Sequence, residues 1–350
     1  MNKSLTFIPF EQLEDTWKAM EKQRVSPFMY YDYMRYIVRD EKRNPFHSVR
    51  IACIQNVSSR EILMIVPLVY VKGPKAHYKM LGDIGGCDIA DALYKDSISG
   101  EERGELISFF YKSLSGRLEF RRLYEKSPLY LNAPPERIVS DETVGYADIP
   151  VPEDWDGYLA SLSGNSRHNL TRAVRRMDRD GIEHRLEVYG GDRSLPKEVW
   201  KLLMKTYYAR FHAKYKRGVF SDETKGGIFV QVLKYIHYRT YKKLWFYTKH
   251  DSHSIPELAN ARTYVLWNGD DMIAFACGFL THDQSICSYP RLAINEKYNY
   301  YTPGCVMLAE ILQLYMQRGV TKHLDLSRGD EAYKFKMGAV AYCTHDIVLK

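Results

Sequence analysis

Apolar and polar residues alternate along the first half of the chain with periods that separate helices from strands. A period near 3.6 predicts a helix, whereas a period of two, or a short apolar run rich in β-branched residues, predicts a strand. Ser26 followed by Pro27 is typical of the first turn of a helix. Residues 79–83 and the turn at 85–88 are predicted to form surface loops. The predicted helices are 10–22, 26–38 and 101–114, and the predicted strands are 48–55, 61–71 and 118–124.

A boundary is predicted at residues 146–152, where a short strand ends in Pro150 and Pro152 and the helical pattern begins again. Asn268-Gly269 between two apolar runs is a strong hairpin signal. With 350 residues the chain exceeds one core of ordinary size, so we expect two domains, 1–146 and 147–350. After the boundary we predict helices at 154–162, 167–176, 196–215 and 222–241, and strands at 183–188, 244–247, 262–267, 272–281 and 285–294.

The C-terminal segment is predicted to form a small-residue turn, a helix and two strands. Pro303 and Gly304 open the apolar helix, and Gly319 ends it. The next strand reaches the polar cluster 325–330, and a last strand covers 341–349. A helix N-terminus has free N–H groups and a positive dipole end, so it can hold a phosphate. The same turn also occurs where nothing binds, so this segment alone leaves both interpretations open.

The composition is that of a soluble globular protein, with 45% hydrophobic and 27% charged residues. The longest apolar runs, 62–71 and 273–280, have the length of strands and fall well below the roughly 20 residues of a spanning helix. The N-terminal residues lack the apolar core of a signal peptide. We therefore expect a cytoplasmic protein without a membrane span.

The six cysteines are scattered, without a C-x-x-C pair or a Cys/His cluster at metal-ligand spacing. Most of them lie in apolar, strand-like segments, where a thiol acts as a small buried hydrophobic group. We therefore expect neither a bound metal nor a disulfide framework.

The formal net charge is +7, and basic residues gather at 167–179, 205–217 and 234–249. Such runs suit an anionic ligand or partner: coenzyme phosphates, an acidic sugar, RNA or a membrane surface. Each run is also consistent with a solvated helix face. Tyrosines interleave with the basic residues, but no RNA-binding signature accompanies them, so we expect them to line the core or a groove.

Three motifs in the second half resemble one known family when they are taken together and in this order. They are Ser166-Arg167-x-Asn169-Leu170-x-Arg172-x-x-Arg175-Arg176, Tyr301-Thr302-Pro303-Gly304 and Asp325-Leu326-x-Arg328-Gly329-Asp330-x-x-Tyr333-Lys334. With the element order around them, they resemble the CelD-like branch of the GNAT acyltransferase superfamily, which is related to the tandem-GNAT FemABX transferases. The strong resemblance covers about residues 155–348.

The resemblance implies an α/β (α+β) fold of tandem GNAT-like domains, with a mixed central sheet flanked by helices. The C-terminal domain is the better-defined GNAT fold, and the N-terminal domain is a degenerate copy. An acyl-CoA donor, such as acetyl-CoA, and transfer of its acyl group to an amine are also implied. The implied acceptor is a small molecule, a sugar or an envelope or polysaccharide precursor in a bacterium.

The resemblance also implies a coenzyme site on a splayed strand and on the helix that follows it. Backbone N–H groups near Tyr289 and Arg291 would hold the thioester carbonyl, and Lys334 would pair with a coenzyme phosphate. The superfamily's Arg/Gln-x-x-Gly-x-Gly/Ala loop is reduced here, so backbone N–H groups are expected to hold the pyrophosphate. The turn contributes Thr302, Gly304, Cys305 and Val306.

Asp325 and Tyr333 are the candidate catalytic residues. Asp325 would take the amine proton or orient the amine, and Tyr333 would protonate the departing thiolate. The structural alternatives are an Asp325–Arg328 ion pair and a tyrosine packed under the loop. For Arg176 and Arg179 we expect a solubilising role. The candidate substrate-binding residues, which would hold an anionic acceptor, are Arg167, Asn169, Arg172, Arg175 and Arg328.

Three other functions stay open. The basic second half and the tandem layout also suit a FemABX-like transferase that uses aminoacyl-tRNA, the one case in which we expect a nucleic acid partner. The second is a binding module that keeps the fold without turnover, and the third is a scaffold that binds no ligand. The sequence does not determine the acceptor or the acyl chain length. The oligomeric state is also open, because the sequence contains no sustained heptad or interface stripe.

Overall fold

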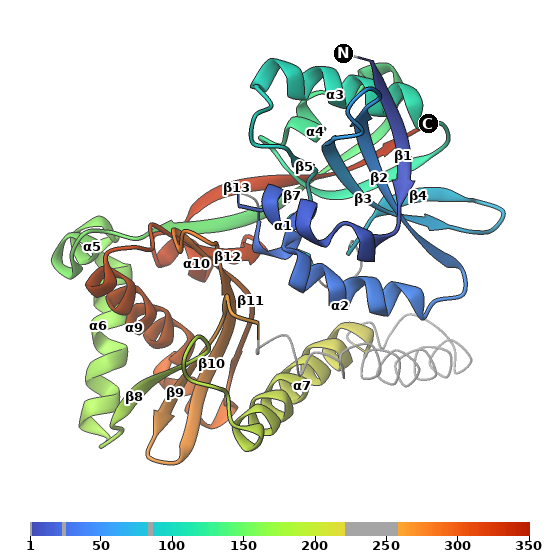
Figure 1. Ribbon diagram of the computed structural model, residues 1–350. Coiled ribbons are helices and arrows are strands. Elements are labelled where there is room, and N and C mark those ends of the chain that lie inside the picture. The colour runs from blue at the N-terminus through green and yellow to red at the C-terminus, as the bar shows by residue number, and fades with distance from the viewer. Residues whose placement is uncertain (1, 23–25, 83–86, 221–257) are drawn as a thin grey trace. The chain divides into compact units, whose positions relative to one another are not determined.

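The computed structural model describes residues 2–22, 26–82, 87–220 and 258–350 (Figure 1). Its contacts divide the chain into two compact units. The first unit comprises Met1–Pro150, Thr281–Ser288 and Asp325–Lys350, and the second comprises Val151–Leu280 and Tyr289–Leu324. Several predicted features lie outside the described residues: the helix at 222–241, the strand at 244–247, the basic run 234–249 and part of the turn at 85–88.

The first unit is built on a mixed sheet. It contains antiparallel pairs, such as β1 (Lys3–Ile8) with β2 (His47–Asn56), and the parallel pair of β4 (His77–Met80) with β6 (Leu118–Tyr124). The last strand of the chain, β13, lies between two strands of the first half (Figure 1). Across the sheet the order is β1 (Lys3–Ile8), β2 (His47–Asn56), β3 (Ile62–Val71), β4 (His77–Met80), β6 (Leu118–Tyr124), β13 (Val340–Leu349) and β7 (Ile138–Pro150), and β5 (Leu93–Tyr94) pairs with β3.

Both faces of this sheet are buried at β2. Ala52 and Ile54 point into the core that α3 (Gly100–Ser113) and α4 (Pro128–Leu131) cover. Ile51 and Cys53 point to the other face, where α2 (Tyr31–Lys42) contacts β2. The other helical segments are η1 (Phe10–Gln12), α1 (Glu14–Met20), η2 (Pro27–Met29), η3 (Pro135–Arg137) and α10 (Ala332–Lys336).

The second unit contains the antiparallel strands β8 (His184–Tyr189), β9 (Ala261–Asn268) and β10 (Asp271–Leu280), followed across the sheet by β11 (Ile286–Ile294). The helices α6 (Gly164–Arg179) and α9 (Pro303–Arg318) lie side by side on one face, and α7 (Lys197–Phe220) lies on the other (Figure 1). α5 (Trp155–Ser161) precedes α6, and η6 (Glu296–Tyr301) leads from β11 into α9. β12 (His323–Arg328) begins in this unit and ends in the first.

Most predicted elements are confirmed where the structure describes them. The Ser26 side chain accepts a hydrogen bond from the Phe28 N–H, as expected of an N-cap. Asn268 and Asp271 pair at the end of the β9–β10 hairpin. Gly319 ends α9 with a φ of 70°. The mixed sheet flanked by helices confirms the predicted fold class.

Three strands correct the predictions for the first half. β1 was not predicted, and the loop predicted at 79–83 is wrong because Lys79 and Met80 are buried in β4. β7 begins at Ile138 rather than at residue 146. Its first eight residues are mostly exposed, so no apolar alternation marks them. Backbone pairing with β13 along this whole stretch makes it a strand.

The predicted division into domains 1–146 and 147–350 stays a prediction. The compact units have different boundaries, because the first unit continues to Pro150 and also includes residues 281–288 and 325–350. No helix in the part of the chain that the structure describes is long and apolar enough to cross a lipid bilayer.

Candidate active site

The N-terminus of α9 is open toward an anion. Thr302 precedes the helix in the left-handed region, with φ 47° and ψ 53°, and its side chain caps no N–H group. Pro303 has no N–H, and the N–H groups of Cys305 and Val306 reach back to the Thr302 carbonyl at 3.0 and 3.4 Å. Among the described residues the Gly304 N–H has no hydrogen-bond partner. The first turn has no acidic residue, so the positive end of the helix dipole is not neutralised within it.

The corresponding end of α3 in the first unit is closed. The Ser99 hydroxyl accepts from the Glu102 N–H, and the Glu102 carboxylate accepts from the Ser99 N–H at 2.8 Å. This capping box satisfies two of the free donors. The hydrogen bonds from Ser99 lower the pKa of Glu102, which therefore stays charged. Glu101 adds a second negative charge to the turn, so an anion is repelled there.

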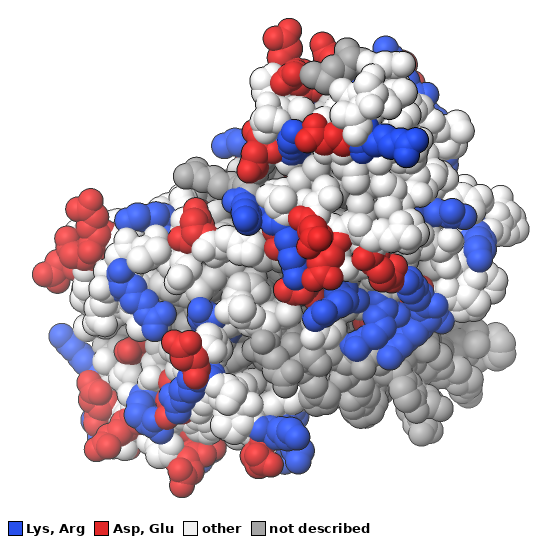
Figure 2. Space-filling model, in the orientation of Figure 1, with Lys and Arg blue, Asp and Glu red and all other residues white. Residues whose placement is uncertain are grey.

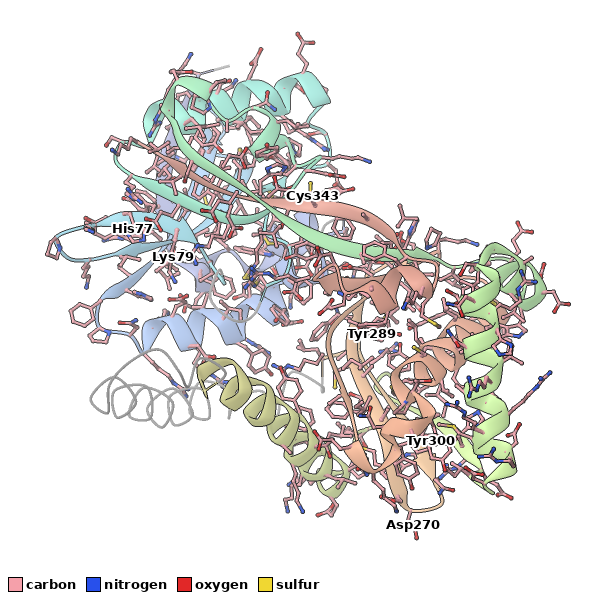
Figure 3. All side chains as sticks on the ribbon, turned by 180° about the vertical axis from the view of Figure 1, so that it is seen from behind. His77, Lys79, Asp270, Tyr289, Tyr300 and Cys343 are labelled. Carbon is pink, nitrogen blue, oxygen red and sulfur yellow. The ribbon has the colours of Figure 1, made fainter. Side chains whose placement is uncertain are left out.

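The end of α6 anchors the turn that leads into α9. The Arg176 guanidinium lies 4.7 Å from the centre of the Tyr300 ring, and it also donates to the Tyr300 carbonyl at 3.4 Å (Figure 3). Next to it, the Tyr301 hydroxyl donates to Asp180 at 2.9 Å, and Asp180 accepts from Arg179 at 2.8 Å. Arg176 and Arg179 thus hold a loop, a role that the sequence did not reveal.

The strand β11 carries two of the residues predicted for the coenzyme site, the buried Tyr289 and the half-buried Arg291. Tyr289 is buried, and its ring centre lies 5.4 Å from that of Tyr264. The guanidinium of Arg291 lies 5.8 Å from the ring centre of Tyr207 on α7. The two candidates therefore pack within the second unit (Figure 3 labels Tyr289).

The predicted substrate residues on α6 are exposed. Arg167, Asn169, Arg172 and Arg175 lie away from the buried side of this helix. In the described part of the chain none of the three arginines has a carboxylate partner. A second basic surface was not predicted from the charge runs. It lies over α2 and comprises Arg35, Arg39, Lys42 and Arg43 (Figure 2).

Asp325, the candidate base, is buried with 5% of its surface exposed. One carboxylate oxygen accepts from the Tyr342 hydroxyl and from the Ser327 N–H, both at 2.8 Å. Burial raises the pKa of Asp325 to about 6, although these hydrogen bonds and one from Ser288 oppose the shift. Arg328 is exposed and is not among the carboxylate's hydrogen-bond partners in the described residues. The sequence carried no signal for Tyr342 as the partner.

Lys334 closes the turn between β12 and α10. Lys334 is 3% exposed, and its ammonium group donates to the carbonyls of Leu326, Ser327, Arg328 and Gly329 at 2.9 to 3.2 Å. The turn needs this support, since Ser327 and Gly329 have φ values of 57° and 110°. The coenzyme-phosphate role of Lys334 stays a prediction, and its partners in the structure are different ones. Tyr333, the candidate acid, is 39% exposed.

A comparison with protein families finds a match for the stretch that contains α6, the start of α9 and the β12–α10 turn. Residues 164–335 match the family described as acetyltransferase (GNAT) domain. This stretch is similar to a GNAT domain. The matched stretch begins at α6, includes α9 and β12, and ends just after Lys334. The matched description is that of a transferase family.

Solved structures show the same fold along the whole chain. A conserved protein of unknown function from Bacteroides thetaiotaomicron VPI-5482 is 12% identical, with a TM-score of 0.52 over 99% of this chain and 100% of that one. The C-terminal domain of a putative lysylphosphatidylglycerol synthetase from Agrobacterium fabrum is 11% identical, with a TM-score of 0.51 over 98% and 93%. FemX reaches 0.47 at 11% identity over 99% and 97%, too low to support a conclusion. A comparison with curated proteins finds no match.

The structure places the predicted residues of the β12–α10 turn and of the start of α9 in two groups. Thr302, Gly304, Cys305 and Val306 form the open end of α9 in the second unit. The β12–α10 turn, with Asp325, Arg328, Tyr333 and Lys334, belongs to the first unit. Within the described residues no group of three His, Cys, Asp or Glu side chains is arranged to hold a metal ion.

Proposed function

We propose that this protein is an acyl-CoA-dependent N-acyltransferase of the CelD-like branch of the GNAT superfamily, acting in the bacterial cytoplasm. The observation that carries the proposal is the contrast between the two helix N-termini. The start of α9 has an unbonded N–H and no acidic residue, whereas the start of α3 is capped and acidic. An anionic coenzyme is therefore expected to bind at the N-terminus of α9 rather than at that of α3.

The residues at the start of α9 fit a pyrophosphate through their backbone. Bound acyl-CoA supplies an acyl group already activated as a thioester. Gly304 presents its N–H, and a Cβ built on it would meet only Ile294 and Leu292, each at 3.8 Å. Arg176 stabilises the turn before α9 through its contact with the Tyr300 ring. Tyr289, Arg291, Thr302, Cys305 and Val306 are the other residues assigned to the donor.

Asp325 is the proposed base and Tyr333 the proposed acid. With a pKa of about 6 the Asp325 carboxylate is largely ionised at neutral pH, yet it is basic enough to accept a proton. Tyr342 fixes its orientation through the 2.8 Å hydrogen bond. Tyr333 is 39% exposed, which suits a group that donates a proton to a departing thiolate.

The acceptor is proposed to be an anionic amine, such as a sugar or an envelope or polysaccharide precursor. Arg172 and Arg175 support this class because both are exposed and neither has a carboxylate partner in the described residues. Arg167, Asn169 and Arg328 are exposed as well and complete the proposed acceptor set. Acetyl is the proposed acyl group.

Thermal unfolding with and without acetyl-CoA, longer acyl-CoA species and free CoA tests the donor. Ligand at about 100 times its Kd should stabilise the native state by about 2.7 kcal/mol. Thr302→Asp should abolish the shift, because its carboxylate would repel a pyrophosphate while aspartate tolerates the left-handed backbone. The matched control is Gly100→Asp at the start of α3, where a Cβ meets no atom within 4 Å. This variant should keep the full shift.

No shift with any coenzyme species would contradict the proposal. Aminoacyl-tRNA would then be the next donor to test, and its binding should weaken steeply with salt. A normal shift without transfer to any amine would indicate a binding module that retains the fold. Both results can be distinguished from a failure to fold, because the thermal unfolding transition measured without ligand shows whether the protein is folded.

A further inference from the structure

A thiol, an imidazole and a carboxylate are aligned in the first unit, apart from the residues discussed above. The Cys343 Sγ lies 3.7 Å from the His345 Nε2, and the His345 Nδ1 lies 2.7 Å from a carboxylate oxygen of Asp141. Nucleophile, base and orienting group follow one another in the order found in acyl-transferring triads. Figure 3 labels Cys343 on β13.

The strand register builds this arrangement. Cys343 and His345 are two residues apart on β13, so their side chains leave the same face. Asp141 on β7 pairs with Ile347, which places it diagonally across from His345 on that face. Gly145, opposite Cys343 on β7, adds no side chain beside the thiol.

The imidazole is held on two sides. The Tyr130 ring stacks on His345 with ring centres 3.9 Å apart and planes at 17°. The Tyr130 hydroxyl donates to the second carboxylate oxygen of Asp141 at 2.8 Å. With Asp141 accepting a hydrogen bond from the Nδ1–H, the neutral ring presents the lone pair of Nε2 to the sulfur.

Glu125 restrains the thiol. It lies opposite Cys343 on the β6 side, where Thr344 pairs with Tyr124, and its carboxylate accepts a hydrogen bond from the thiol at 2.9 Å. Burial, Glu125 and Asp141 together raise the pKa of Cys343 to about 11. The resting sulfur is therefore a thiol, and it needs a base in order to react.

We propose that Cys343 is a nucleophile that takes an acyl group from a thioester, with His345 as general base and Asp141 as its positioning residue. The sulfur forms a bond to the acyl carbon, and the thiol proton passes to the His345 Nε2. The bond between the acyl carbon and the donor sulfur breaks, and that sulfur takes the proton and leaves as a free thiol. Cys343 is half-buried, so a small thioester can reach it.

The test uses S-acetyl-N-acetylcysteamine, a thioester without nucleotide or pyrophosphate, and locates acetylated cysteines by peptide mass spectrometry. Cys343 should react faster than Cys305, which is also half-buried. His345→Gln should slow the reaction at Cys343 about 100-fold. Asp141→Asn should slow it less. Glu125→Gln should shift the pH profile of the reaction to lower pH, because the negative charge of Glu125 beside the thiol is removed.

The buried thiols of Cys53 and Cys277 are internal reporters of unfolding, since they react only in an opened protein. The probe carries no nucleotide or pyrophosphate, so this test is independent of the proposed coenzyme site. The proposal is overturned when Cys343 reacts no faster than Cys305. It is equally overturned when His345→Gln leaves the rate unchanged in a protein whose buried thiols stay protected.

Discussion

The Tyr342 hydroxyl on β13 donates a 2.8 Å hydrogen bond to the Asp325 carboxylate on β12. This bond joins the last strand of the chain to the proposed base. It favours the charged form of Asp325, against the burial that favours the neutral form. Tyr342 thereby lowers the proton affinity of the Asp325 carboxylate without itself taking part in the proton transfer.

Tyr342→Phe should move the pH dependence of acyl transfer upward. Without the hydroxyl, burial raises the pKa of Asp325 further, so the carboxylate ionises at higher pH. The free energy of unfolding at pH 7.5 should fall by about 1.5–3 kcal/mol, the usual contribution of a hydrogen bond to a charged group. A pH–rate profile and urea unfolding measure the two effects. An unchanged profile would show that Asp325 does not set the rate.

Asp325→Asn should abolish transfer without destabilising the protein at pH 7.5. The pKa of Asp325 is raised from 3.8 to about 6, so the unfolded chain loses this proton at lower pH than the folded protein does. Wild-type stability therefore falls as pH rises from about 4 to 6, by up to about 3 kcal/mol. Asparagine avoids this loss and keeps an acceptor for Tyr342. The stability advantage of the variant should grow across this pH window in urea titrations.

Asp91→Asn is the matched control for the Asp325 variant. Burial also raises the pKa of Asp91 to about 6, and its carboxylate accepts from the Ser127 hydroxyl at 2.7 Å. Its stability should depend on pH in the same direction, but transfer should continue. Full turnover in Asp325→Asn would remove Asp325 from the mechanism.

Lys334→Met should destabilise the protein by about 3–5 kcal/mol, because four carbonyls of the 326–329 turn lose their shared donor. The control is Lys336→Met, an exposed lysine on the same helix, which should change stability little. Thermal unfolding with and without acetyl-CoA separates two roles. A stable Lys334→Met protein that loses only the coenzyme shift would support the phosphate role instead.

Neighbouring arginines of α6 should have different effects. Arg176→Gln removes the contact with Tyr300 and loosens the turn before α9, so it should weaken donor binding; the contact itself contributes about 0.5–1 kcal/mol. Arg175→Gln should leave donor binding unchanged and raise KM for an anionic acceptor. Steady-state kinetics with each substrate varied in turn distinguishes them. Equal effects of both variants on donor KM would contradict this division.

Local patterns in the sequence determined most of the elements that the structure describes. The N-cap at Ser26, the Asn268-Gly269 hairpin and the turn before α9 depend on residues within a few positions of one another. Caps, hairpins and amphipathic stripes are local, so they are visible without a structure. The three motifs likewise pointed to a GNAT domain over the stretch that the family comparison matches.

Only the tertiary structure decided which distant groups meet. The exposed first half of β7 is a strand because β13 pairs with it, and that pairing joins residues about 200 positions apart. The same pairing aligns Asp141 with His345 and Cys343. Alternation in a sequence shows which face a side chain takes, but it does not show which strand lies beside it. The partners of buried polar groups depend on that neighbour, and so the sequence did not reveal that Asp325 accepts from Tyr342 or that Lys334 donates to the carbonyls of its own turn.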